Sequence, residues 1–340
     1  MSAKKRTSDS VVQLPSVSNK KGKADAEDLR FSVNIEEPNH LKTAMEVIHS
    51  AGHPKAYIKV MRTPKFEGLQ ISSLNEETKS TMCKVVLPMA LQNFSPVPRT
   101  IIVEKDGQKV EKEVQFILFC VQVPVFLKLL QSLTQSNMLV LRSFDEATIH
   151  YQSYSPNSMK NYSQGAIKTV CSDGNIPMDF GRLEFPVTLD IGLSEFRSTI
   201  NSAVSNAASD ITLVTKTKTI RTANKTKVVS LFFVSCTTPM IDMEKVFPST
   251  CEMEGEKLIM KALDPEPFGE DGFGDCDEYE EKTCARFDAK ILQGIVKCMP
   301  TTDVILNLDS KHPLIITYNF GEGAHIFFVV GPKLEGEDND

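Results

Sequence analysis

The chain has 340 residues, of which 41% are hydrophobic and 24% are charged. At roughly 150 residues per domain, this length predicts two domains, and the composition excludes a wholly disordered or collagen-like chain. No stretch of about 18 consecutive apolar residues occurs, so we expect no membrane-spanning helix. The formal net charge of −6 argues against a general attraction to nucleic acid, so any contact with DNA must use localised positive charge.

The N-terminal region predicts a tail without regular structure. Residues 1–30 are rich in Ser, Lys, Asp and Gly and cannot bury enough apolar surface to become ordered. The basic clusters at 4–6 and 20–23 resemble a bipartite nuclear-import signal, with a plain solvating tail as the alternative. The first residues lack the apolar core of a signal peptide, so we expect no secretion and a reducing compartment. The eight cysteines are therefore expected to be free thiols that mostly fill the core.

Four segments repeat one pattern, an amphipathic helix followed by two β-rich runs. The helices are predicted at 39–52, 123–136, 193–207 and 287–299. Alternating β-branched and polar residues predict the strands, which lie at 56–61 and 68–74, 137–144 and 147–154, 210–216 and 228–235, and 303–309 and 313–320. In the fourth helix Phe287, Ile291 and Ile295 recur at every fourth residue, which gives a stripe facing the core.

The outer face of each predicted helix carries a base among small or amide side chains. These bases are Lys42, Lys128, Arg197, Lys290 and Lys297. The same spans hold three acidic residues, so their net charge is +2 in a chain of net −6. The excess is small, and four ordinary solvated helix faces are the alternative interpretation.

Two irregular stretches interrupt the repeats. Residues 161–186 fall between the second and third repeats, where a linker between two domains is expected. Residues 264–281 are half acidic and contain two prolines and three glycines, which predicts an exposed loop. Together with the poorly periodic residues before it, this loop suggests an acidic insertion at about 238–282.

The C-terminal residues 303–335 resemble the last β-hairpin and tail of the proliferating cell nuclear antigen family, the eukaryotic-type DNA sliding clamps. The matching features are Pro313-Leu314, Tyr318, Gly323 with His325, Phe327-Phe328-Val329 and Pro332-Lys333-Leu334-Glu335. Residues 68–74 resemble the family's first-domain signature, which continues with Asp where this chain has Asn75. The similarity covers about 31–340 except 238–282. The chain is longer than cellular clamps, and its differences resemble those of clamps from large DNA viruses.

The resemblance implies an α+β fold, the DNA-clamp fold, with two similar domains of two helix-plus-sheet repeats each. Helices would line the inner face, and sheets would lie outside. The N-terminal clamp domain is expected at 31–160, the interdomain connector at 161–186 and the C-terminal clamp domain at 187–340. Clamps of this family close as homotrimers, and our candidate edge strands for this contact lie near 147–154 and 227–236.

The function that the resemblance implies is a sliding clamp that encircles duplex DNA without sequence preference. The five bases on the helices would contact DNA, and the ring would act as a DNA polymerase processivity factor placed by a clamp loader. A pocket for the peptides of replication and repair proteins is expected under the connector. Its matching positions are Leu74, Ile176, Pro177, His312, Pro313, Val329, Gly331, Pro332 and Leu334. Val329 replaces an aromatic residue of the family, so the peptide preference is expected to differ.

Three other readings stay open. Within the same fold, the chain could be a subunit of a heterotrimeric checkpoint-type clamp or a non-encircling polymerase accessory factor. An enzyme, cysteine-dependent, is the rival from another class, but no catalytic motif is present, and the glycines of 269–274 lie among carboxylates that would repel phosphate. No Cys/His spacing fits zinc. We expect no enzymatic activity, no cofactor, no metal and no membrane contact, and a location in the nucleus, or at a cytoplasmic replication site if the chain is viral.

Overall fold

A computed structural model describes most of the chain beyond the N-terminal tail. The described residues are 29, 31–35, 38–75, 80–92, 94, 99–105, 108–114, 116–133, 138–145, 147–155, 158–170, 183–222, 225–238, 241–263, 279–297, 301–321 and 323–333. The predicted tail therefore lies almost wholly outside them. Their helices are α1 (Pro38–Ser50), α2 (Val123–Gln131), α3 (Leu193–Ser205) and α4 (Ala289–Lys297). Each overlaps one predicted helix, and none of them is long and apolar enough to cross a membrane.

The strands of the described residues form three sheets. The first contains, in spatial order, β11 (Ser158–Lys168), β10 (Thr148–Ser155), β9 (Met138–Ser143), β1 (Phe31–Ile35) and β5 (Leu91–Gln92). The second contains β17 (Glu280–Asp288), β13 (Asp210–Thr222), β14 (Lys225–Thr237), β15 (Asp242–Glu254), β16 (Lys257–Ala262), β12 (Val187–Gly192), β18 (Asp303–Leu308), β19 (Leu314–Asn319), β20 (His325–Val330), β4 (Thr81–Pro88), β3 (Phe66–Leu74), β2 (Lys55–Thr63) and β8 (Phe116–Gln122). The third is a separate hairpin of β6 (Arg99–Lys105) and β7 (Gln108–Val114).

The chain order contains one unit four times, a strand, a helix and three further strands. The four units are β1-α1-β2-β3-β4, β8-α2-β9-β10-β11, β12-α3-β13-β14-β15 and β17-α4-β18-β19-β20. The predicted repeat is therefore present, but it is longer than the sequence analysis proposed. The strand before each helix was missed, and in β8 the reason is plain, because Phe116–Gln122 is apolar at nearly every position and shows no alternation.

Helix α4 begins two residues later than predicted because Asp288 caps it. The Asp288 carboxylate accepts hydrogen bonds from the backbone N–H groups of Lys290 and Ile291, at 2.9 and 3.0 Å. A side-chain oxygen at this position satisfies donors that have no partner within the helix. Phe287 consequently belongs to strand β17, where it is buried and pairs with Ile211 instead of starting the helix.

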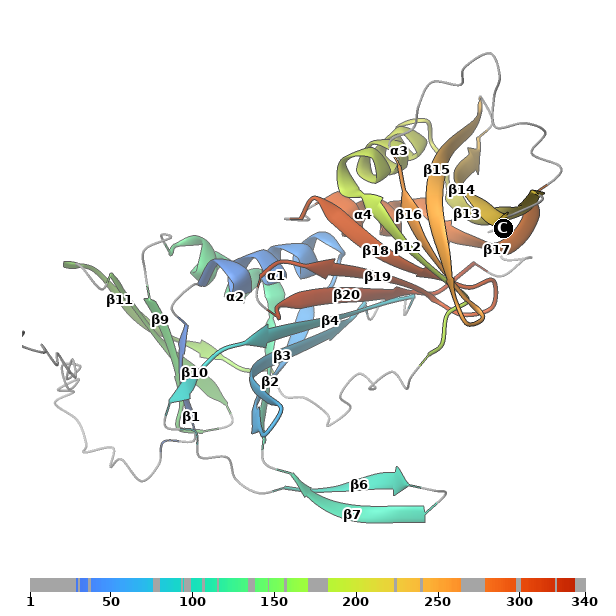
Figure 1. The fold of residues 1–340 in the computed structure, drawn as a ribbon. Coiled ribbons are helices and arrows are strands. Elements are labelled where there is room, and N and C mark those ends of the chain that lie inside the picture. The colour runs from blue at the N-terminus through green and yellow to red at the C-terminus, as the bar shows by residue number, and fades with distance from the viewer. Residues whose placement is uncertain are drawn as a thin grey trace, which may run out of the picture.

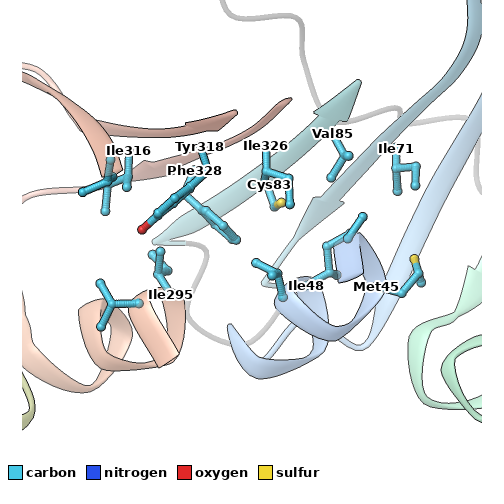
Figure 2. Packing of buried hydrophobic residues seen from close by; sticks show 14 of the residues in the cluster. Met45, Ile48, Ile71, Cys83, Val85, Ile295, Ile316, Tyr318, Ile326 and Phe328 are labelled. Atoms are coloured by element: carbon cyan, nitrogen blue, oxygen red, sulfur yellow. The ribbon is translucent and has the colours of Figure 1, made fainter. Parts of the chain in front are cut away.

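The two halves of the chain share a sheet, because β4 pairs with β20 from Thr81 to Val86. Figure 1 shows the helices on one side of the strands, with α1 and α4 near the point where the halves meet. In Figure 2 the alternate residues of β3, β4, β20 and β19 point toward Met45 and Ile48 of α1 and Ile295 of α4. These side chains belong to one buried cluster that extends through both halves. The junction between the halves is thus part of the hydrophobic core.

Part of the predicted acidic insertion has regular structure. Strands β15 and β16 form an antiparallel hairpin, and β16 also pairs in parallel with β12. The described residues 241–263 therefore extend the large sheet, whereas 264–278, most of the acidic loop, lie outside the described residues. The predicted connector is also narrower than 161–186, since β11 continues to Lys168.

A buried histidine lies beside the junction of the two halves. His53 is 1% exposed, and its ring meets that of Phe328 edge to face, with centroids 6.3 Å apart. Its Nδ1 lies 3.0 Å from Ser73 Oγ, and its Nε2 lies 3.2 Å from Thr81 Oγ1. The Ser73 hydroxyl donates to Lys55 O, so Ser73 Oγ is left to accept the Nδ1–H of His53. Burial lowers the pKa of His53 from 6.5 to about 4, an effect that a hydrogen bond with the Ser73 backbone partly offsets.

We expect His53 to lower the free energy of unfolding in acid. Between pH 6.5 and about 4 the unfolded chain binds a proton at this ring, whereas the folded chain does not, so stability falls as the pH falls. The loss approaches about 3 kcal/mol at pH 4. Urea unfolding at pH 7, 5.5 and 4.5 of the wild type and of His53→Gln measures it. The variant should lose less stability over this range, and equal losses in the two proteins would contradict the assignment.

Candidate nucleic-acid interface and partner-docking surface

The four helices form one continuous row. Helix α2 contacts α1, α1 contacts α4, and α4 contacts α3. Their buried residues face the sheets, as the close-up of α1 and α4 shows (Figure 2). The polar faces of all four helices therefore point away from the sheets and lie on one side of the molecule.

The α1–α4 contact depends on a glycine. Ser50 Oγ, at the end of α1, donates to Gly294 O at 2.9 Å. A Cβ placed on Gly294 would lie 2.9 Å from Ser50 O, which is a backbone atom and cannot rotate away. Gly294 therefore lets helices from the two halves of the chain approach closely, at a position where alanine would otherwise favour the helix by about 1 kcal/mol.

Gly294→Val is expected to destabilise the protein by about 1–3 kcal/mol, because the added side chain forces α1 and α4 apart and strains the packed junction. Thermal unfolding measures the change. Gln293→Val, one residue away on the same helix, is the matched control and should have a smaller effect. Equal unfolding temperatures for wild type and Gly294→Val would show that the contact is not close in solution.

A hollow of about 550 Å³ lies where α1, α2 and α4 meet. It is lined by Glu46, His49, Ser50, Leu127, Gln131, Lys290, Gln293, Gly294 and Lys297. Lys290 and Lys297 are exposed, and neither makes an ion pair with any residue that the structure describes. Two unpaired ammonium groups beside one glutamate give this hollow a positive potential in an otherwise acidic chain.

Helix α3 presents a different surface. A hollow of about 560 Å³ over this helix is lined by Ser194, Arg197, Ser198, Asn201, Ser202, Ser205 and Asn206. Its one base is half-buried, and the Arg197 Nε–H donates to Val296 O of α4 at 2.8 Å. Arg197 thus satisfies a carbonyl in the last turn of α4, which sequence reasoning did not anticipate. The Gln293 amide also donates to Asn201 Oδ1, at 3.2 Å, so α3 and α4 are tied at two points.

The remaining predicted bases lie on the same row of helices. Lys128 is exposed on α2, and Lys42 is partly exposed on α1, one turn before Glu46 of the first hollow. All five predicted bases therefore occupy the helical side of the molecule. Lys290 and Lys297 share one hollow, Lys42 and Lys128 lie on the neighbouring helices, and Arg197 is directed toward α4.

The opposite face of the large sheet carries an apolar row. The pairing register aligns Leu74 of β3, Met82 of β4, Val329 of β20 and Ile315 of β19, which we call the apolar row. These residues alternate with the helix-facing ones of Figure 2, so they point away from the helices. Val329 is 7% exposed, and the other three are partly exposed.

The apolar row brings together part of the predicted peptide pocket. Leu74 and Val329 belong to it, and Pro313 and Gly331 lie at its end, because Leu314 pairs with Val330. The Gly331 N–H donates a hydrogen bond to Ser80 O at 2.8 Å, and Pro332 follows Gly331 in the chain. His312 instead forms a hydrogen bond between its Nδ1 and Asp309 Oδ2, at 2.9 Å. Ile176, Pro177 and Leu334 lie outside the described residues. The sequence did not reveal Met82 and Ile315 as members of this site. Only the strand register shows that Met82 lies between Leu74 and Val329 and that Ile315 lies next to Val329.

The predicted edge strands are wrong. Residues 147–154 form β10, which lies between β9 and β11, and residues 227–236 belong to β14, which lies between β13 and β15. The first sheet has β11 at one edge and the short strand β5 at the other. On the side of β15 that faces away from β14, residues Ser249–Glu254 pair with β16. The Leu263 N–H also donates a hydrogen bond to Pro248 O on this side. Among the described residues, no strand pairs there with Asp242–Phe247, so this segment is an open edge.

Comparisons with known proteins agree with this architecture. No protein family model matches the chain, and the comparison with curated proteins gave no match. Among solved structures, the proliferating cellular nuclear antigen of Entamoeba histolytica superposes with a TM-score of 0.61 at 14% identity, over 90% of this chain and 100% of that one. The PCNA2–PCNA3 complex of Sulfolobus tokodaii matches with a TM-score of 0.57 at 14% identity, over 89% and 99% of the two chains. The chain thus has the α+β clamp fold of proliferating cell nuclear antigen, as the sequence resemblance predicted.

Proposed function

We propose that this protein is a sliding clamp, a ring that encircles duplex DNA without sequence preference and tethers a DNA polymerase. The observation that carries the proposal is the row of four helices, with Lys42, Lys128, Lys290 and Lys297 on their polar faces. A ring holds DNA by topology, so it needs only weak contacts to phosphates, and sparse bases suit sliding. The clamp fold supports this reading, and a non-enzymatic role accompanies it.

One chain supplies four helices, so encircling a duplex requires further copies. Strand β11 and the open segment of β15 lie in different halves of the chain, and pairing β11 of one copy with β15 of the next gives a head-to-tail contact that can close into a ring. These strands replace the edges proposed from the sequence. We propose a homotrimer; the complex of two different chains in Sulfolobus tokodaii keeps a hetero-oligomer as the second candidate.

Light scattering coupled to size-exclusion chromatography tests the assembly. A mass three times the 37.8 kDa of the chain is expected. A monomer at every concentration would contradict the homotrimer and favour a hetero-oligomeric or non-encircling accessory factor.

We also propose that the apolar row, with Pro313, Gly331, Pro332 and Leu334, forms the docking site for peptides of replication and repair proteins. An aliphatic patch on a rigid sheet suits the apolar anchors of a short helical turn. Pro332→Ala combined with Leu334→Ala is expected to weaken peptide binding severalfold while leaving the oligomer intact. Calorimetry measures this affinity, and an unchanged affinity in the double variant would contradict this site.

The location follows from the proposed role. A clamp works where DNA is replicated, so we propose the nucleus, with a clamp loader as a further partner. Whether the chain comes from a large DNA virus, and so acts at a cytoplasmic replication site, stays a prediction from the sequence.

A further inference from the structure

The last turn of α4 is held by both neighbouring helices. The carbonyls of the last four residues of an α-helix have no partner within the helix, and in α4 two of these carbonyls accept hydrogen bonds from other helices. Ser50 Oγ of α1 donates to Gly294 O at 2.9 Å, and the Arg197 Nε–H of α3 donates to Val296 O at 2.8 Å. Lys297 follows Val296, ends α4 and lines the hollow between α1, α2 and α4. The position of Lys297 therefore depends on these two contacts.

Arg197 is directed toward the protein. It is half-buried, although it lies on the polar face of α3. Burial raises the pKa of Tyr318, a fully buried residue of β19 (Figure 2), and the positive charge of Arg197 acts in the opposite direction. The guanidinium group is therefore close enough to the core to act on a buried hydroxyl. The dipole of α4 also favours a cation at the C-terminal end of this helix.

The exposed surface of α3 is uncharged. Its exposed residues are Ser194, Ser198, Ser202 and Ser205. Glu195, the one acidic residue of the helix, forms an ion pair with Lys245 of β15 at 2.7 Å. Arg197 is the one base of this helix, so any charged contact between α3 and a phosphate would have to use it, yet its Nε–H is already bonded to α4.

We infer that Arg197 is a positioning residue, which holds the last turn of α4 so that Lys297 is directed toward DNA, and that it makes no phosphate contact itself. The inference rests on the sliding-clamp function proposed above and assigns the base of α3 a different role from the lysines of the other helices. Binding costs conformational entropy when a side chain must be ordered, and a turn that is already held in place reduces this cost. Arg197 thus lets one exposed lysine contribute more in a bore with few bases.

Two substitutions of Arg197 separate positioning from direct contact. In Arg197→Gln the amide nitrogen is attached to Cδ, as Nε is in arginine, so an N–H donor to Val296 O is kept while the positive charge is lost. Arg197→Met has a side chain of similar length but loses both the donor and the charge. The pair therefore differs in the hydrogen bond to α4 and not in charge.

Binding of the full-length protein to a short labelled duplex, measured by fluorescence polarisation at several salt concentrations, tests the inference. Arg197→Met should weaken binding about threefold, within the range of one exposed charge contact, and Arg197→Gln should restore most of the affinity. In a protein that already carries Lys297→Ala, Arg197→Met should weaken binding little further, because residues that act through one contact are not additive. The salt slope of the double variant should equal that of Lys297→Ala alone.

A direct phosphate contact would give the opposite results. Arg197→Gln would bind as weakly as Arg197→Met, and the salt slope would fall by about one further unit in the Lys297→Ala protein. Either result would overturn the positioning role, as would equal affinities of Arg197→Met and the wild type. Thermal unfolding checks that each variant is folded, and if Arg197→Met is not, the affinity and salt slope of Arg197→Gln alone still decide between the two roles.

Failure of the inference can be distinguished from failure of the proposed function by Lys297→Ala alone. Weaker binding in this variant, together with additive effects of Arg197→Met, would overturn the positioning role and leave Lys297 at the DNA surface. Full binding by Lys297→Ala would overturn both the positioning role and the assignment of Lys297 to the DNA surface.

Discussion

Replacing Lys290 and Lys297 together by alanine is expected to lower stimulation of a DNA polymerase about tenfold or more. Both lysines are exposed in the hollow between α1, α2 and α4. A ring of several copies would present each of them several times toward the duplex, so small contacts add up. Each exposed contact contributes less than about 1 kcal/mol, and each lost phosphate contact lowers the salt slope of binding by about one unit.

The oligomer of this double variant should be unchanged, since neither side chain is buried or paired within the described residues. Lys65→Ala combined with Lys261→Ala removes the same charge from two exposed positions, one in the β2–β3 turn and one on β16, and is the matched control. It should retain stimulation. Full stimulation by Lys290→Ala with Lys297→Ala, or an equal loss in the control, would show that these lysines do not face the DNA.

Glu244→Pro is expected to open the ring and reduce the mass in solution to that of one chain. Leu263 donates to Pro248 O, so the backbone groups of Pro248 point away from β14. Alternate residues of a strand share this direction, which directs the N–H and C=O of Glu244 to the open edge of β15. Proline removes this donor and blocks the approaching strand, while the hydrogen bonds from β15 to β14 are kept.

Glu244→Ala is the control, because it removes the same exposed carboxylate and keeps the N–H. It should remain an oligomer, and both variants should unfold cooperatively near the wild-type temperature. An intact oligomer in Glu244→Pro would place the contact between copies elsewhere. A monomer in both variants would assign the contact to the carboxylate rather than to strand pairing.

The sequence was sufficient for the features that depend on local periodicity. The apolar stripes predicted all four helices, and the predicted ranges 123–136 and 287–299 contain the whole of α2 and α4. A helix that covers a sheet must place apolar residues at regular intervals, which is why this pattern is visible in the sequence. The C-terminal resemblance anticipated the fold. The strands before the helices were missed where they are apolar on both faces, as in β8.

The features that were missed depend on contacts between distant segments. Alternation shows that 147–154 and 227–236 are strands, but it contains no information on their neighbours, so the edge assignment failed. Arg197 could be placed on the outer face of its helix, yet only the tertiary structure reveals that its Nε–H donates to α4. The apolar row combines four strands from both halves of the chain, so its members Met82 and Ile315 could not be recognised before the register was known.

The central claim is that the row of helices surrounds a passage through which a double helix threads. Threading onto linear DNA tests it without a clamp loader. Protein is mixed with a duplex biotinylated at both ends, and streptavidin is added to block the ends either before or after the protein, followed by a wash at high salt. The account predicts that protein is retained only when the ends are blocked afterwards. Retention that does not depend on the order of addition would contradict it.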